Sequence, residues 1–351
     1  MANINKILYT TTSYPPAIGG AQLHTHQIVQ RIASRRPVQV VTQWAENRTD
    51  WLLGTTLRAP AAPRTYTVED IPVALITLTA SERRRLVPYV LGYYAMKPVA
   101  IKKIAAVLAA KIEPFAAECG LIHNVRIGRE PLSFASLQVA RQLNVPFVFV
   151  PYHHPRWVGW NYREYLNLYR QADALIALTN AEKEVLIKLG VAEEQIYVTG
   201  NGPHLAKTAD PDRFRRLINV AADVPIILFL GQKYRYEGIE ALVGAAKIVW
   251  QQWPEARFLF LGPRTSFSKR LFAHQKDARI IEMDIVDLQT KTNALAACHL
   301  LCLPSSQESF GGVFTEAWSF GKPVIGGDIP AVREVVDQGV NGYLVQPAAP
   351  A

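Results

Sequence analysis

Two glutamates that lie eight residues apart flank a pair of glycines in the stretch PSSQESFGGVFTEAWSFGKP. The glutamates are Glu308 and Glu316, and the glycines are Gly311 and Gly312. Glycine lets the backbone pass close to a ligand without a side chain in the way. A helix that begins at Gly312 leaves N–H groups of its first turn unpaired, and such groups bind phosphates. Two carboxylates beside an anion site indicate hydroxyl groups as their partners, and a nucleotide sugar carries both phosphates and hydroxyls.

This stretch resembles the signature of the retaining glycosyltransferases of family 4, which have the GT-B fold. The resemblance rests on Glu308 and Glu316, on Phe310 and Gly311 between them, and on the Gly-Lys-Pro-Val run at 321–324. It extends over nearly the whole chain. A glutamate pair alone is a weak signal, and the alternative is an ordinary helix with Glu316 on its solvated face.

The resemblance implies an enzyme that moves a hexose from a nucleoside diphosphate sugar to a hydroxyl acceptor, with retention. The acceptor is a glycan, a lipid-linked molecule or a small molecule. Glu308 is then expected at the transferred sugar and Glu316 at the nucleotide ribose. The diphosphate is expected on the amides of Gly311, Gly312 and Val313.

Neither a metal ion nor a cofactor is implied, because helix-end amides can meet the phosphate charge and the nucleotide sugar is a co-substrate. The resemblance also adds Phe310 to the expected donor site. A catalytically weak relative that binds a nucleotide or a partner without turnover remains the alternative.

The segment 231–238 departs from the family pattern. Family members usually present an arginine and, a few residues later, a lysine directly before a glycine, and the two cations neutralise the donor diphosphate. Here Gln232 stands at the arginine place and Glu237 at the lysine place. We predict that Lys233, the cation nearest the strand end, contacts the phosphate, with Arg235 open to interpretation as an exposed turn residue. Glu237 then either turns away from the diphosphate or weakens donor binding.

The N-terminal residues predict a strand, a helix and a second strand. The strand covers 6–11, the helix opens at Ala21, and the second strand covers 38–41, as in a βαβ unit. No G-x-G-x-x-G motif is present, so a dinucleotide cofactor is not supported. Gly19 and Gly20 place bare backbone at the helix N-terminus, and the resemblance puts this loop near the donor phosphates and the acceptor. A turn that needs glycine for its geometry alone is the alternative.

A pair of histidines follows the apolar strand predicted at 146–150. Its near-continuous apolar residues are typical of a parallel sheet covered on both faces, and ligands bind at the carboxyl edge of such sheets. The resemblance implies a histidine near the transferred sugar. His153 aligns best, although His154 and a purely structural loop histidine remain alternatives.

Length and composition indicate two α/β domains. A chain of 351 residues with 49% hydrophobic and 19% charged residues is too long for one core and is typical of a soluble globular protein. We predict Rossmann-like, doubly wound domains over 1–205, on the acceptor side, and 206–351, on the donor side, which face a cleft in the GT-B fold. Family chains continue past a strand like 342–345 with further helices, so we expect the C-terminal end to be truncated.

Charge and helical pattern bear on the partners. The net charge of +9 favours anionic partners, but no nucleic-acid motif is present and we expect no nucleic acid.

Segment 83–103 predicts a helical piece over 89–97 and then a helix with an apolar face. The three arginines at 83–85, together with Leu86, Tyr93 and Tyr94, suit contact with an anionic membrane. A core helix with a basic edge is the favoured alternative. With no membrane span or signal peptide, we expect a cytoplasmic protein, with the inner membrane face as an optional peripheral site.

Overall fold

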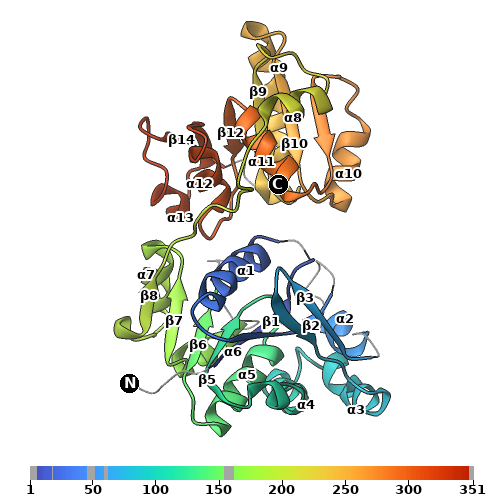
Figure 1. Cartoon of the computed structure of the whole chain (residues 1–351), viewed down its shortest axis with the longest axis vertical. Coiled ribbons are helices and arrows are strands. Elements are labelled where there is room, and N and C mark those ends of the chain that lie inside the picture. Colours follow the sequence, from blue (N-terminus) through green and yellow to red (C-terminus); the bar gives the residue numbers. More distant parts are fainter. Residues whose placement is uncertain (1–5, 18, 46–51, 59–61, 154–161, 348–351) are drawn as a thin grey trace. The chain divides into compact units, whose positions relative to one another are not determined.

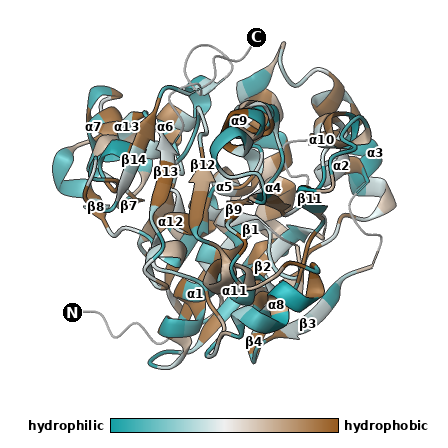
Figure 2. Ribbon diagram, turned by 90° about the horizontal axis from the view of Figure 1, so that it is seen from above, coloured by the Kyte–Doolittle hydropathy of each residue, from teal (hydrophilic) through white to brown (hydrophobic). Residues whose placement is uncertain are grey.

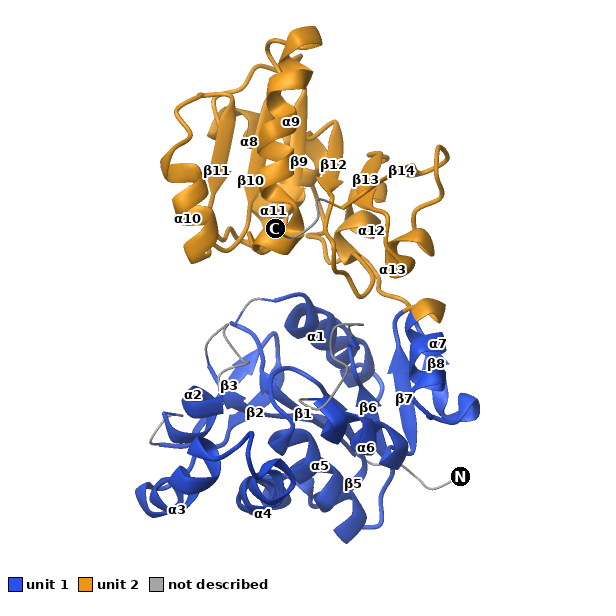
Figure 3. Ribbon diagram, turned by 180° about the vertical axis from the view of Figure 1, so that it is seen from behind, with its two compact units in different colours: residues 1–178, 182–199 blue, residues 179–181, 200–351 orange. Residues whose placement is uncertain are grey.

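The computed structural model describes residues 6–17, 19–45, 52–58, 62–153 and 162–347 (Figure 1). The chain forms two compact units (Figure 3). Unit 1 holds residues 1–178 and 182–199, and unit 2 holds residues 179–181 and 200–351. The sequence analysis put the junction at 205, whereas the chain enters unit 2 for good at Gly200.

Unit 1 is built on an eight-stranded sheet with the order β3-β4-β2-β1-β5-β6-β7-β8. All neighbours run parallel except β3 and β4, which are antiparallel. The strands are β1 (Lys6–Ser13), β2 (Val38–Trp44), β3 (Arg64–Val68), β4 (Ile71–Leu75), β5 (Cys119–Val125), β6 (Phe147–Val150), β7 (Ala174–Ala177) and β8 (Ile196–Val198). Because β1 has β2 on one side and β5 on the other, the direction of winding reverses between β1 and β5, where ligands bind in open α/β sheets.

Helices cover this sheet. They are α1 (Gly20–Ala33), α2 (Leu52–Leu57), α3 (Ala80–Leu91), α4 (Lys97–Ala116), α5 (Pro131–Gln142), α6 (Arg163–Gln171) and α7 (Asn180–Lys188), with the 3-10 turn η2 (Glu193–Gln195). The apolar face expected for the second helix of 83–103 is the buried face of α4, since Ile101, Ile104 and Leu108 lie in the core. Apolar residues, brown in Figure 2, gather on the strands and inner helix faces. Among the described helices, none combines the length and apolar character that crossing a membrane requires.

Unit 2 is built on a six-stranded, fully parallel sheet with the order β11-β10-β9-β12-β13-β14. Its strands are β9 (Ile226–Leu230), β10 (Arg257–Leu261), β11 (Ile280–Met283), β12 (Leu300–Leu303), β13 (Val324–Gly327) and β14 (Gly342–Val345). Its helices are α8 (Pro211–Leu217), α9 (Ile239–Gln252), α10 (Ser266–Ala273), α11 (Leu288–Ala297), α12 (Gly312–Trp318) and α13 (Pro330–Arg333), with the 3-10 turn η3 (Arg235–Glu237). In this doubly wound order the winding reverses between β9 and β12.

The prediction of two α/β units with parallel sheets is therefore confirmed, but some elements differ. The helical piece expected over 89–97 is wrong, because α3 begins at Ala80 behind a capping box formed by Thr79 and Glu82 and runs through Pro88. A proline in the last turn removes only one intrahelical hydrogen bond, so it does not end the helix there. The hairpin β3–β4 and the helices α8 and α10 were not predicted.

Candidate functional site

The loops that follow β9 and β12 meet at the carboxyl edge of the unit 2 sheet. The Ser306 N–H donates to the Tyr236 carbonyl at 2.8 Å, and the Ser306 hydroxyl donates to the same oxygen at 3.2 Å. Gly238 lies so close that a Cβ there would be 2.6 Å from the Pro304 carbonyl oxygen. Hydrogen bonds and close backbone packing therefore hold the two loops together at the point where the winding of the sheet reverses.

The glycine pair forms the N-terminus of α12. Gly311 has φ of 77° and ψ of 56°, the left-handed region, and a Cβ there would overlap the Phe314 ring, so glycine is needed for both reasons. The Gly311 N–H donates to Glu308, so the expectation that it is open to phosphate is wrong. The N–H groups of Gly312 and Val313 have no partner among the described residues and no side chain caps the helix.

The helix α12 has seven residues and ends at Trp318. Gly321 follows in the left-handed conformation with φ of 63°, and the Lys322 N–H donates to the Ala317 carbonyl at 3.1 Å. A glycine in this conformation after the last turn prevents the chain from continuing as a helix.

Glu308 lies half-buried in the loop between β12 and α12. Burial raises the pKa of Glu308 to about 7, against the N–H groups of Gly311 and Ser309, which favour its charged form. The neighbouring Phe310 ring lies beside Gly200, because a Cβ on that glycine would be 3.7 Å from it. Glu308 is thus a carboxyl group close to its own ionisation point at neutral pH.

Glu316 lies on α12 and is almost fully buried. One of its oxygens accepts from the Lys291 ammonium at 2.6 Å and from the backbone N–H of His204 at 3.3 Å. Its other oxygen has no hydrogen-bond partner within the described part of the chain. Burial raises the pKa of Glu316, and Lys291 opposes that rise. Lys291 was not predicted, since only the tertiary fold places α11 beside α12.

Lys233 departs most from its predicted role. Its side chain is fully buried, and its ammonium donates to the Glu282 carboxylate and, at 2.6 Å, to the Met283 carbonyl. Both acceptors belong to β11, whereas Glu308 and α12 follow β12 on the other side of β9. The prediction that Lys233 contacts the phosphate is therefore wrong for this structure, because the ammonium is already held on the far side of the loop.

The remaining residues of this loop divide into exposed and buried ones. Arg235 is exposed, lies 3.6 Å from the Glu240 carboxylate and stands over the Phe267 ring, as the turn interpretation expected. Gln232 is half-buried, and its carbonyl accepts from the Tyr234 N–H at 2.8 Å. Glu237 does not turn out to solvent. It is 8% exposed, and one of its oxygens has no hydrogen-bond partner among the residues described.

In unit 1, α1 begins at Gly20, one residue before the predicted start. Gly19 is the N-cap residue, and no side chain caps the helix. Gly20 is exposed, and no atom lies within 4 Å of a Cβ added to it. The loop therefore presents bare backbone at the carboxyl end of β1, although a Cβ at Gly19 would meet the Gln22 side chain.

His153 follows β6 at the same edge of the unit 1 sheet and is buried. Its backbone N–H donates to a Glu182 carboxylate oxygen at 2.6 Å, and its ring Nδ1 lies 3.2 Å from the Tyr169 hydroxyl. Glu182 also accepts from the Leu178 N–H at 2.9 Å, and burial raises the pKa of Glu182 to about 7. Nothing in the sequence pairs Glu182 with the histidine loop, since the two lie on different elements. The alternative His154 lies outside the described residues.

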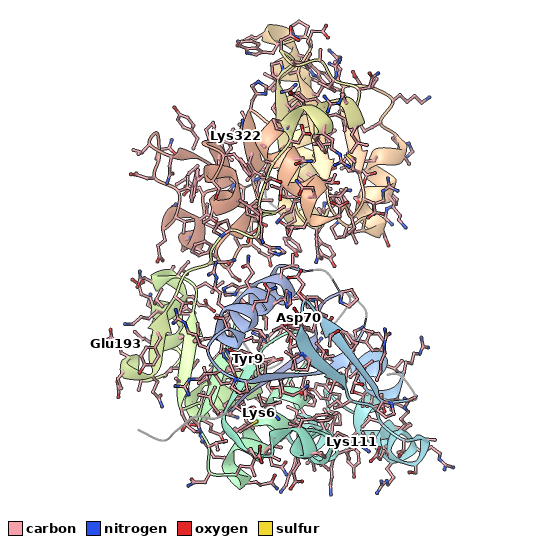
Figure 4. The ribbon with its side chains drawn as sticks, in the orientation of Figure 1. Lys6, Tyr9, Asp70, Lys111, Glu193 and Lys322 are labelled. Carbon is pink, nitrogen blue, oxygen red and sulfur yellow. The ribbon has the colours of Figure 1, made fainter. Side chains whose placement is uncertain are left out.

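Two more histidines lie near this edge. His24 of α1 has its Nδ1 2.7 Å from the Tyr152 hydroxyl, and His123 of β5 lies against Tyr9 with ring centroids 4.8 Å apart (Tyr9 is labelled in Figure 4). Burial lowers the pKa of both histidines to about 4. Both rings are therefore neutral at physiological pH.

Comparison with known proteins gives this architecture a family. A family model described as Glycosyltransferase Family 4 matches residues 18–207, more than half of the chain. The chain belongs to glycosyltransferase family 4. A second model, described as Glycosyl transferases group 1, matches this family 4 chain over residues 224–351. The predicted family is therefore confirmed.

Individual relatives agree with the family. The D-inositol 3-phosphate glycosyltransferase of Xylanimonas cellulosilytica is 30% identical over 190 residues, which are 50% of this chain and 45% of that protein. The sulfoquinovosyl transferase of Arabidopsis thaliana is 28% identical over 236 residues, 61% of this chain and 44% of that protein. The chain thus matches less than half the length of these relatives.

Among solved structures, Anabaena HepE in complex with UDP and glucose has a TM-score of 0.72 at 23% identity. The match covers 97% of this family 4 chain and 86% of that one. This likeness supports the fold, and the predicted GT-B fold is confirmed.

Proposed function

We propose that this protein is a glycosyltransferase that moves a hexose from a nucleoside diphosphate sugar to a hydroxyl acceptor, with retention. The observation that carries the proposal is the meeting of Glu308, Glu316 and two unpaired amides where the winding of the unit 2 sheet reverses. Such reversal points are the usual ligand sites of open α/β sheets.

Each group at this edge has a role that suits one part of the donor. The free N–H groups of Gly312 and Val313 bind the diphosphate. The unpartnered oxygen of Glu316 accepts from a ribose hydroxyl, and Lys291 orients that carboxylate by holding its other oxygen. Glu308 accepts from hydroxyls of the transferred sugar. HepE, whose fold this chain shares, has been solved with UDP and with UDP-glucose, which supports a nucleotide sugar as donor.

The proposal uses no metal ion and no cofactor. Fixed N–H groups aimed at the leaving diphosphate stabilise its charge without having to reorganise during the reaction. His153 and the Gly19-Gly20 backbone are proposed to border the sugar and the acceptor, since both lie at the carboxyl edge of the unit 1 sheet.

A membrane surface is our proposal for where the acceptor is met. Leu86 and Tyr93, which the sequence analysis placed at this contact, are buried and cannot make it. Other apolar side chains of α3, α4 and the turn between them are exposed instead: Val87, Leu91, Tyr94, Met96 and Val99. Arg84, Arg85, Lys102 and Lys103 are exposed on the same two helices. Exposed apolar and basic side chains together suit contact with an anionic lipid surface.

A donor screen tests the proposed function. UDP-, GDP- and ADP-sugars are incubated with the protein, and release of nucleoside diphosphate is followed with and without hydroxyl acceptors. The anomeric configuration of the product is read by NMR. We expect turnover with retention, and we expect Glu308→Gln to lower it at least about a hundredfold, a loss of about 3 kcal/mol in transition-state stabilisation.

The matched control is Glu240→Gln, which removes an exposed glutamate from the same unit. It is expected to keep wild-type turnover. Near wild-type turnover in Glu308→Gln would remove Glu308 from the site. Nucleotide binding without any turnover in the wild type would favour the alternative of a non-catalytic relative.

A further inference from the structure

Glu237 faces the loop that carries Glu308. The carbonyl of its neighbour Tyr236 accepts both hydrogen bonds from Ser306, and the next residue, Gly238, touches Pro304. The turn η3 therefore packs against the start of the β12–α12 loop. Glu237 is buried in this contact, at the place where the family pattern has a lysine.

Neither carboxyl group has a cation as partner among the described residues of unit 2. The charged groups of the surrounding elements are engaged elsewhere: Arg235 pairs with Glu240, Lys233 pairs with Glu282, and Lys291 pairs with Glu316. Burial and the charge of Glu308 both raise the pKa of Glu237 well above its ordinary value. A buried and a half-buried carboxyl that lie next to each other, with no cation beside them among these residues, do not both ionise readily, so one of them retains a proton.

The surroundings decide which carboxyl keeps the proton. Glu308 accepts from the N–H groups of Gly311 and Ser309, and both bonds favour its ionised form. One oxygen of Glu237 is buried and accepts no hydrogen bond from any residue that the structure describes. The proton therefore resides on Glu237, and Glu308 is the first of the two to ionise as the pH rises.

We infer that Glu237 serves the donor site as an uncharged carboxylic acid beside Glu308, and that binding of a nucleoside diphosphate draws a proton onto this pair. The inference rests on the proposed function, since it takes the adjacent α12 amides as the diphosphate site. An arriving diphosphate adds negative charge next to the pair and disfavours an ionised Glu237. Glu237 is a positioning residue, because it acts through Glu308 and through the charge of the site.

The sign of the pH dependence follows from this coupling. When binding takes up a proton, affinity is highest while Glu237 is already protonated and falls as the pH rises above its pKa. For one linked proton the apparent Kd then rises by up to about tenfold per pH unit. Glutamine has nearly the same shape and no charge, so Glu237→Gln is expected to bind with a Kd that does not change with pH above pH 8, where Glu308 is ionised.

Isothermal titration with UDP between pH 7 and 9 tests the inference. The second ionisation of a terminal phosphate lies near pH 6, so the charge of UDP is constant over this range. Titrations in two buffers of different ionisation enthalpy give the number of protons taken up. We expect the proton fraction taken up by the wild type to grow from pH 7 to pH 9, as the free protein loses the proton of Glu237, with a Kd that rises at least about fivefold over this range. Above pH 8, where Glu308 is ionised, the variant Glu237→Gln is expected to take up none.

Two further variants support the comparison. The control Glu255→Gln removes an exposed glutamate of the same unit that pairs with Arg257 and not with Arg235, and it is expected to behave as the wild type. Glu237→Lys, which carries the family's cation, is expected to bind UDP more tightly with no proton uptake, and it serves if Glu237→Gln does not fold.

The possible failures are distinct. Absence of proton uptake in the wild type would overturn the inference while leaving the proposed function standing, and so would uptake above pH 8 that persists in Glu237→Gln. If UDP, GDP and ADP all fail to bind the wild type, the proposed function fails and the inference falls with it.

Discussion

Lys233 is predicted to hold unit 2 together rather than to bind the donor. The change Lys233→Met keeps most of the side-chain volume and removes the ammonium that donates to Glu282 and to the Met283 carbonyl. Removing one partner of a buried ion pair costs about 3–5 kcal/mol. Here the Glu282 carboxylate keeps its two hydrogen bonds from the Arg264 Nε–H, at 3.0 and 2.8 Å, and the Glu282 side chain is 14% exposed. We therefore expect a smaller loss, about 2 kcal/mol.

Urea denaturation of the wild type and Lys233→Met measures this loss, and titration with UDP measures the effect on binding. We expect the Kd for UDP to change less than about twofold, because the ammonium lies on the β11 side of the loop. Lys247→Met, in an exposed lysine of α9, is the control and is expected to stay within about 0.5 kcal/mol of the wild type. Wild-type stability together with a tenfold weaker affinity for UDP would refute this reasoning and return Lys233 to the phosphate, as its place in the sequence suggested.

Two other predictions concern the phosphate amides and the membrane. In Gly312→Val the added Cβ would lie 2.7 Å from the Asn201 amide and would crowd the free N–H groups, so titration should show UDP binding at least about tenfold weaker, or about 1.4 kcal/mol. Unchanged affinity would remove these amides from the site. Replacing the arginines at 83–85 by glutamine should reduce cosedimentation with anionic vesicles, as should added salt. A wild type that never cosediments at low salt would argue against a membrane acceptor.

Elements with a strong pattern could be predicted from the sequence. The near-continuous apolar strand β6 and the helix α4 with its regular apolar face were found where expected. The hairpin β3–β4 was missed because its turn uses Glu69 and Asp70, with φ of 47° and 67°, where glycine or asparagine is the usual signal.

The partners of the site residues could not be predicted. Lys291 and Glu182 reach Glu316 and the His153 loop from helices distant in the sequence, so their roles exist only after folding. The order of residues along a loop also does not reveal which side of a strand a side chain takes. Lys233 was assigned to the phosphate because it lies nearest the end of β9, yet it points to β11.

A crystal structure of the protein with UDP bound is the most direct test of the proposed donor site. We predict the phosphates on the N–H groups of Gly312 and Val313, and a ribose hydroxyl on the free oxygen of Glu316. Lys233 should keep its bond to Glu282. UDP bound away from the loops that follow β9 and β12, or phosphates held by Lys233, would contradict the account.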